Sequence, residues 1–154
     1  EGIFVGYRYY DEKKLPVAFP FGYGLSYAKF EYSDLKITRL GDTDFTVSYS
    51  IKNVSETDAQ EVSQVYVSDT VSSVSRPEKE LKGFSKDLIK AGEKKTIGIK
   101  LNFRSFAFYS LPLKRWFVEN GKFKISVGGS SRDIFLQQII EIKLPQKEQY
   151  SYQR

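Results

Sequence analysis

The stretch TDFTVSYSIKN, residues 43–53, alternates apolar and polar side chains over almost its whole length. Its apolar positions are Phe45, Val47, Tyr49 and Ile51. Because successive side chains of a β-strand point to opposite faces, this period of two predicts a strand with one face in a hydrophobic core and the other in water. The chain is therefore interpreted first as a β protein.

The same alternation recurs in residues 94–101 (KKTIGIKL), 121–129 (GKFKISVGG) and 137–144 (QQIIEIKL). The residues expected to point inward are Ile97, Ile99, Leu101, Phe123, Ile125, Val127, Ile140, Ile142 and Leu144. Residues 61–69 (EVSQVYVSD) carry valine on both faces, which is typical of a more central strand.

Turn-forming sequences separate these runs at the spacing of an all-β sandwich. They lie at residues 40–44, 53–59, 90–95, 119–122 and 128–133. Asn120-Gly121 suits a type I′ turn and predicts a hairpin from residues 115–118 into 122–125. Gly83 predicts a β-bulge, because the apolar parity changes across it. We predict an all-β immunoglobulin or fibronectin type III-like sandwich of seven or eight antiparallel strands over residues 27–145.

The two ends of the chain do not fit that sandwich. Residues 1–26 contain a strand-like run, GIFVGYRYY at 2–10, which suggests the closing strand of a preceding domain followed by a connector. Residues 146–154 are polar and are expected to form a frayed or docked tail. Because the chain contains no methionine, even at position 1, we expect it to be an excised or processed part of a longer protein.

The composition excludes several classes of function. Without cysteine or histidine, the chain cannot provide zinc-finger ligands, haem ligands or a nucleophilic triad with histidine. The net charge of +5 does not indicate nucleic-acid binding, because the lysines are interspersed with acids. The longest charge-free stretch, residues 15–28, contains two prolines and is too short to span a bilayer. We expect neither a nucleic-acid partner nor a membrane.

Glycoside hydrolysis requires two carboxyl groups, one acting as an acid and the other as a base or nucleophile. Glu78 with Glu80, and Asp42 with Asp44, are the closest pairs in sequence, and solvated charges beside lysines explain them better. The fragment GDTD at 41–44 is too short for a calcium loop. We therefore assign no catalytic, cofactor-binding or metal-binding residue to this chain.

The aromatic residues are the main candidates for a functional surface. Tyr7, Arg8, Tyr9 and Tyr10 suit either a sugar-stacking platform or packing against a neighbouring domain, and the second is favoured. Trp116 has the same two interpretations. The segment FPFGYGLSY, residues 19–27, combines rings with glycines and suits a connector between packed domains. Its candidate interface residues are Phe19, Phe21, Tyr23 and Tyr27. Asn53-Val54-Ser55 is an N-glycosylation sequence, which makes Asn53 a possible acceptor.

Several motifs, taken in order, resemble the C-terminal end of glycoside hydrolase family 3 enzymes, the β-glucosidase and β-xylosidase group. They are EGIFVGYRYYD (1–11), FPFGYGLSY (19–27), RPEKELKGF (76–84), AGEKKTIGIKL (91–101) and VGGSSRDI (127–134). The chain departs from the family at one loop, where Ser55 and Ala59 stand in place of two glycines.

The resemblance implies that this chain is a fibronectin type III-like domain with its connector, lying after a barrel domain and an α/β sandwich domain. The family's catalytic aspartate and glutamate belong to those upstream domains, so no residue here inherits either role. The expected function is a non-catalytic accessory domain of a β-glucosidase that acts on terminal non-reducing β-D-glucosyl residues, with the upstream domains as partners. An autonomous carbohydrate- or protein-binding module is the alternative. The residues do not fix a compartment, and the resemblance favours a secreted or periplasmic one.

Overall fold

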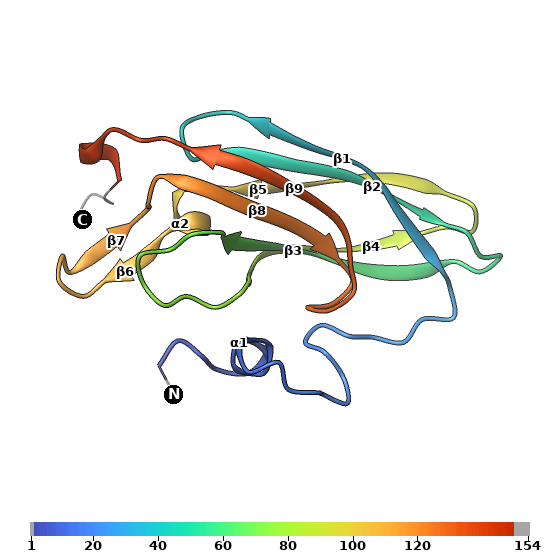
Figure 1. The fold of residues 1–154 in the computed structure, drawn as a ribbon. Helices are drawn as coiled ribbons and strands as arrows, with labels where there is room; N and C mark the ends of the chain where they lie inside the picture. The colour runs from blue at the N-terminus through green and yellow to red at the C-terminus, as the bar shows by residue number, and fades with distance from the viewer. Residues whose placement is uncertain (1, 150–154) are drawn as a thin grey trace.

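The computed structural model describes residues 2–149, in which two antiparallel β-sheets pack face to face (Figure 1). One sheet has the strand order β1-β2-β5 and the other has the order β4-β3-β8-β9. The strands of these sheets are β1 (Phe30–Arg39), β2 (Phe45–Asn53), β3 (Ala59–Asp69), β4 (Glu80–Ile89), β5 (Lys94–Leu101), β8 (Gly121–Gly128) and β9 (Ile134–Ile142). The predicted sandwich of seven or eight strands is confirmed.

The core lies between the two sheets and is built by the predicted alternation. Phe45, Val47, Tyr49 and Ile51 are all buried on β2, and the inward residues of β8 are buried opposite them. Phe106 fills the centre, with its ring edge-on to Phe45 and Phe123. The buried hydroxyl of Tyr49 forms a hydrogen bond of 2.6 Å with Ser63 Oγ, so the one polar atom of this side chain has a partner.

Strand β3 is central in its sheet, as its two-sided valine content predicts, because it pairs with β4 and with β8. The bulge predicted at Gly83 is also present. Val65 pairs with Gly83 and Tyr66 pairs with Leu81, so Lys82 has no partner in the register. A Cβ on Gly83 would lie 2.5 Å from Ile99 Cγ2, so a side chain there would collide with the facing sheet.

The hairpin predicted through Asn120-Gly121 is wrong. Strand β7 (Arg115–Phe117) pairs with β6 (Phe108–Ser110) in a separate two-stranded sheet, whereas β8 pairs with β3 and β9. The Asn120 side chain explains the difference. Its Oδ1 accepts from Leu144 N at 2.7 Å and its Nδ2 donates to Leu144 O at 2.9 Å, so it extends the pairing beyond β9 in place of forming a tight turn.

The strand-like run at residues 2–10 is also corrected, because Tyr7–Glu12 form a short helix, α1. Helical spacing places Tyr7 and Asp11 on one side, toward the sandwich, and leaves Tyr9 and Tyr10 exposed. Aromatic residues favour strands in isolation, but the contacts of this segment with the sandwich override that preference.

Two further short elements complete the described chain. Helix α2 (Phe103–Phe106) begins with a capping box formed by Asn102 and Ser105, and a 3-10 turn, η1, covers Gln146–Glu148. The last part of the expected tail, residues 150–154, lies outside the described residues. Within residues 2–149, no helix has the length and apolar character needed to cross a bilayer.

Candidate functional site: the connector and its contacts

The segment before β1, residues 2–29, runs along the outside of the β4-β3-β8-β9 sheet, with α1 beside the start of the chain (Figure 1). We call this segment the connector; it extends three residues beyond the predicted 1–26. Tyr7 is its main anchor. The Tyr7 ring stacks on Phe21 with centroids 4.6 Å apart, and it meets Tyr66 of β3 edge-on at 6.2 Å. The hydroxyl of Tyr7 accepts a hydrogen bond of 2.9 Å from Leu81 N. One side chain therefore joins two parts of the connector to β3 and β4.

The backbone of the connector is fixed at Phe21 and Gly22. Ser131 N donates to Phe21 O at 2.8 Å. Gln64 Nε2 donates to Gly22 O at 3.2 Å and to Gly129 O at 2.7 Å, so one amide group holds both segments. Gly22 has φ of 81°, and a Cβ there would overlap the Gln64 side chain. The connector can therefore pass this close to β3 only with glycine at this position.

A buried carboxylate links the connector to two loops of the sandwich. Asp11 is 7 % exposed, with Lys79 Nζ 3.0 Å from its Oδ2 and Arg132 Nε 3.3 Å from its Oδ1. Arg132 Nη2 also donates to Leu15 O at 2.8 Å. Burying a carboxylate is costly unless cations neutralise it, and these two provide that charge from outside the connector.

A second charged network lies beside the first and centres on Glu80. Arg76 Nη2 and Lys82 Nζ each lie 3.1 Å from a Glu80 oxygen, and Arg8 Nη2 of the connector lies 3.5 Å away. Arg76 also pairs with Asp69 at 3.3 Å. Burial alone would raise the pKa of Glu80, but Lys82 and Arg76 outweigh it and lower the pKa. Glu80 is therefore held as a carboxylate.

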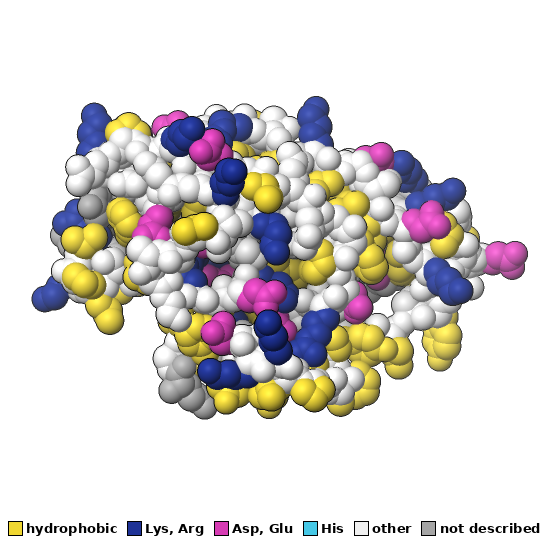
Figure 2. Space-filling model, viewed as in Figure 1, with side chains coloured by type: hydrophobic (Ala, Val, Ile, Leu, Met, Phe, Trp, Pro, Cys, Tyr) yellow, Lys and Arg dark blue, Asp and Glu magenta, His cyan; other side chains and the backbone are white. Residues whose placement is uncertain are grey.

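The other side of the connector has no cover in the described chain. Figure 2 shows hydrophobic side chains gathered along the lower edge, where the connector runs. Tyr27 and Leu25 are 102 % and 88 % exposed, and Phe19 is 71 % exposed beside the ring of Tyr23. We call this surface the connector face. Its members are Phe19, Phe21, Tyr23, Leu25 and Tyr27, each more than two-fifths exposed.

The comparisons with known proteins agree with this geometry. A family model described as a fibronectin type III-like domain matches residues 61–131. The chain is 50 % identical over 145 residues to a thermostable β-glucosidase B from Acetivibrio thermocellus, covering 92 % of this chain and 19 % of that protein. A crystal structure of the Bifidobacterium adolescentis family 3 β-glucosidase superposes with a TM-score of 0.90 at 43 % identity, covering 92 % of this chain and 21 % of that one. This chain contains a fibronectin type III-like domain and matches the C-terminal part of family 3 β-glucosidases.

The relatives differ in the sugar named for them. An exo-α-(1→6)-L-arabinopyranosidase from Bifidobacterium longum is 49 % identical over 134 residues, covering 87 % of this chain and 18 % of that enzyme. This chain thus spans about a fifth of the length of the curated relatives it matches. Nearly equal identity accompanies two different named activities in these relatives.

The carboxylate pair Glu78 and Glu80 does not suit glycosidase chemistry, and both members of the other pair, Asp42 and Asp44, are exposed. Glu80 is bound by cations on both oxygens and stays ionised, whereas a general acid must hold a proton. Glu78 is more than half exposed and lies 4.0 Å from Lys79 Nζ. Glu80 therefore has a structural role, and Glu78 is a solvent-exposed charge.

The exposed aromatic residues do not form a flat platform for a sugar ring. Tyr9 and Tyr10 are each 44 % exposed, but their planes meet at 83°. Trp116 is half-buried, with Arg104 Cζ 3.4 Å from its ring centroid and Tyr109 edge-on. The Arg104 guanidinium therefore covers one face of the Trp116 ring.

Asn53, the possible glycosylation acceptor, has its side chain inside the folded domain. Its side chain is fully buried, and Nδ2 donates to Thr57 O at 2.8 Å and to Ile89 O at 3.0 Å. Its Oδ1 accepts from Ser55 N at 2.9 Å. A glycan on Nδ2 would replace one of the two donated hydrogen bonds, and the buried side chain leaves little space for it in this folded conformation. The three hydrogen bonds of Asn53 close the loop between β2 and β3.

Sequence reasoning missed the polar residues that anchor the connector. Gln64, Lys79 and Arg132 lie far apart in the chain, and each resembles an ordinary surface residue. Asp11 directly follows a run of aromatic residues, but the adjacent Glu12 makes it look like part of an ordinary charged turn. Only the folded arrangement shows that its partners come from two distant loops.

Proposed function

We propose that this chain is the non-catalytic C-terminal accessory domain of a family 3 β-glucosidase, and that it stabilises the preceding domains by packing the connector face against them. The observation that supports this most is the two-sided connector. One side is bound to the sandwich by stacking, hydrogen bonds and ion pairs, and the other exposes a continuous set of large apolar side chains. Exposed apolar patches of this kind commonly mark protein interfaces.

The substrate proposed for the parent enzyme is a terminal non-reducing β-D-glucosyl residue, as the name of the Acetivibrio thermocellus relative suggests. Its catalytic aspartate and glutamate are proposed to lie upstream of this chain. The division into a connector at 1–26, a sandwich at 27–145 and a tail at 146–154 remains a prediction. Tyr7 and Arg8 contact β4 of the sandwich, so in the proposed interface they hold the connector in place and the exposed rings make the contact with the preceding domains.

The test compares the chain alone, the parent enzyme, and the parent lacking this domain on a chromogenic β-glucoside. We expect no hydrolysis by the chain alone, and a lower inactivation temperature for the truncated parent than for the intact enzyme. An intact inactivation temperature after truncation would contradict the stabilising role. Saturable binding of cello-oligosaccharides by the chain alone would favour the alternative, an autonomous carbohydrate-binding module.

A further inference from the structure

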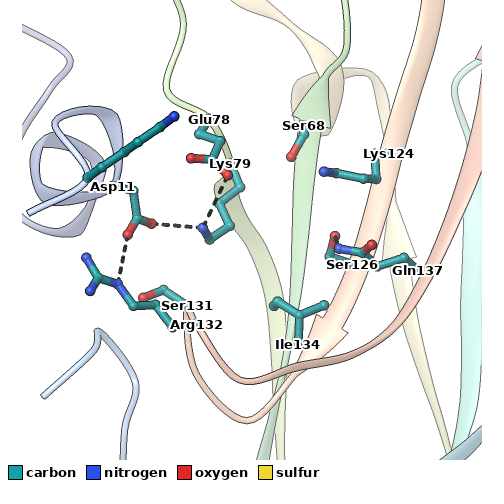
Figure 3. A pocket seen from close by; sticks show the side chains of 11 residues that line it. Asp11, Ser68, Glu78, Lys79, Lys124, Ser126, Ser131, Arg132, Ile134 and Gln137 are labelled. Atoms are coloured by element: carbon teal, nitrogen blue, oxygen red, sulfur yellow. Dashed lines mark hydrogen bonds and ion pairs between the residues drawn. The ribbon is translucent and has the colours of Figure 1, made fainter. Parts of the chain in front are cut away.

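A polar cavity of 410 Å³ lies between α1 and the outer face of the β3-β8-β9 sheet. Figure 3 shows Asp11, Lys79 and Arg132 on one side of it, and Ser68, Lys124 and Ser126 projecting from β3 and β8 on the other. Figure 2 shows the corresponding gathering of basic and acidic side chains above the connector. The connector, the loop before β4 and the β8-β9 loop all contribute to its walls.

Positive charge is in excess around this cavity. Its lining holds the cations Lys14, Lys79, Lys124 and Arg132 but only the two carboxylates Asp11 and Glu78. Asp11 is paired with Lys79 and Arg132, although its Oδ2 makes no hydrogen bond within residues 2–149 and interacts with Lys79 Nζ at 3.0 Å by charge. Within residues 2–149, neither Lys14 nor Lys124 has a carboxylate within 4.0 Å, so both ammonium groups remain available to a ligand.

Two hydroxyl groups in the lining also lack protein partners. Ser131 is 1 % exposed, and its buried Oγ makes no hydrogen bond within the described part of the chain. Ser68 is 6 % exposed; its hydroxyl forms no hydrogen bond to residues 2–149, and unlike Ser131 Oγ it remains in contact with solvent. Buried polar atoms nearly always have a partner, so an unpaired one beside a polar cavity indicates water or a ligand.

The unused groups define the chemistry that would fill this space. Ammonium and hydroxyl groups donate hydrogen bonds, and donors with excess positive charge bind oxyanions most strongly. A neutral sugar ring would instead require an aromatic surface, and the cavity lining contains none. We infer that this cavity is a binding site for a small oxyanion of the sulfate or phosphate type, held by Lys124 and Ser131 with Lys14 and Ser68.

This site does not depend on the proposed accessory role. Lys14 belongs to the connector, whereas Lys124 belongs to β8, so one anion would contact both bodies. A ligand that binds only the docked arrangement stabilises it by mass action. The bound oxyanion would therefore hold the connector against the sandwich in addition to the contacts of Asp11.

The test is an NMR titration of the chain with sodium sulfate at constant ionic strength, set with sodium chloride. We expect saturable amide shifts centred on Ser68, Lys79, Lys124 and Ser131, all fitting one dissociation constant. Lys124→Gln is expected to weaken binding about tenfold or more, since it removes a charged hydrogen-bond donor. Lys124→Arg should retain binding.

Lys122→Gln is the matched control, because Lys122 is on the same strand and outside the cavity lining. It should leave the dissociation constant unchanged. Shifts that fail to saturate, or that are equal in Lys124→Gln and Lys122→Gln, would overturn the site and leave a water-filled cavity. Equal shifts with glucose in place of sulfate would overturn the oxyanion chemistry.

Discussion

Tyr7 and Phe21 stack with their ring centroids 4.6 Å apart and their planes 19° from parallel. This contact closes the connector on itself, because it joins α1 to the segment that follows it. The Tyr7 hydroxyl then bonds to Leu81 N of β4. The connector is therefore an ordered part of this domain, and it presents a fixed apolar surface on its other side.

Gly22→Ala is expected to loosen the connector and to destabilise the chain by about 1–3 kcal/mol, since it places a side chain at φ of 81° and against Gln64. Gly24→Ala is the matched control, because a Cβ at Gly24 has open space around it. Urea unfolding of both variants measures the difference. Equal effects would show that the close approach to Gln64 is unimportant.

Asp11→Asn is expected to cost about 1–3 kcal/mol, because it leaves Lys79 and Arg132 without their shared buried partner. Glu12→Gln changes the neighbouring acid, which is exposed and outside both ion-pair networks, and should cost less than about 0.5 kcal/mol. Proteolysis within residues 13–20 provides a second readout, with faster cleavage expected only in Asp11→Asn. Equal cleavage rates in the two variants would count against the anchoring role of Asp11.

The Glu80 network predicts a dependence of stability on pH. The pKa of Glu80 is lowered from its ordinary value of 4.5, so its carboxylate stabilises the folded state above that pH. This contribution is lost as the pH falls through the lowered pKa. The free energy of unfolding should therefore differ most between the native chain and Glu80→Gln near neutral pH, and the difference should shrink below pH 4.5. A difference independent of pH would contradict this account; Glu78→Gln is the exposed control.

Asn53→Asp is expected to destabilise the sandwich by about 3 kcal/mol or more, because it places a carboxylate oxygen against the carbonyl oxygens of Thr57 and Ile89. Gln138→Glu makes the same chemical change at an exposed position of β9. Thermal unfolding at neutral pH compares the two. A small effect of Asn53→Asp would show that the buried amide is dispensable.

The fold was predictable because the strands of the sandwich carry their own signal. Val47 and Tyr49 on β2, or Ile125 and Val127 on β8, obey a period of two that one buried face imposes. Gly83 was also local enough to identify, since a bulge changes the parity of the residues around it.

The errors came from residues whose partners are distant in sequence. Asn120 next to glycine suits a turn in any local analysis, yet its amide bonds to Leu144. The aromatic run that forms α1 suits a strand, yet the contacts of Tyr7 and Asp11 with the sandwich require a helix. The connector was expected to pack rings against another domain, but its polar anchors could not be found without the fold.

The most direct test of the proposed docking is the thermal unfolding of Tyr27→Ala in the isolated chain and in the full-length parent enzyme. Tyr27 is fully exposed here, so the isolated chain should change by less than about 0.5 kcal/mol. In the parent, loss of a buried interface aromatic should cost about 2 kcal/mol or more and lower the unfolding temperature. An unchanged unfolding temperature of the parent, or an equal loss in both proteins, would contradict the claim that the connector face packs against the preceding domains.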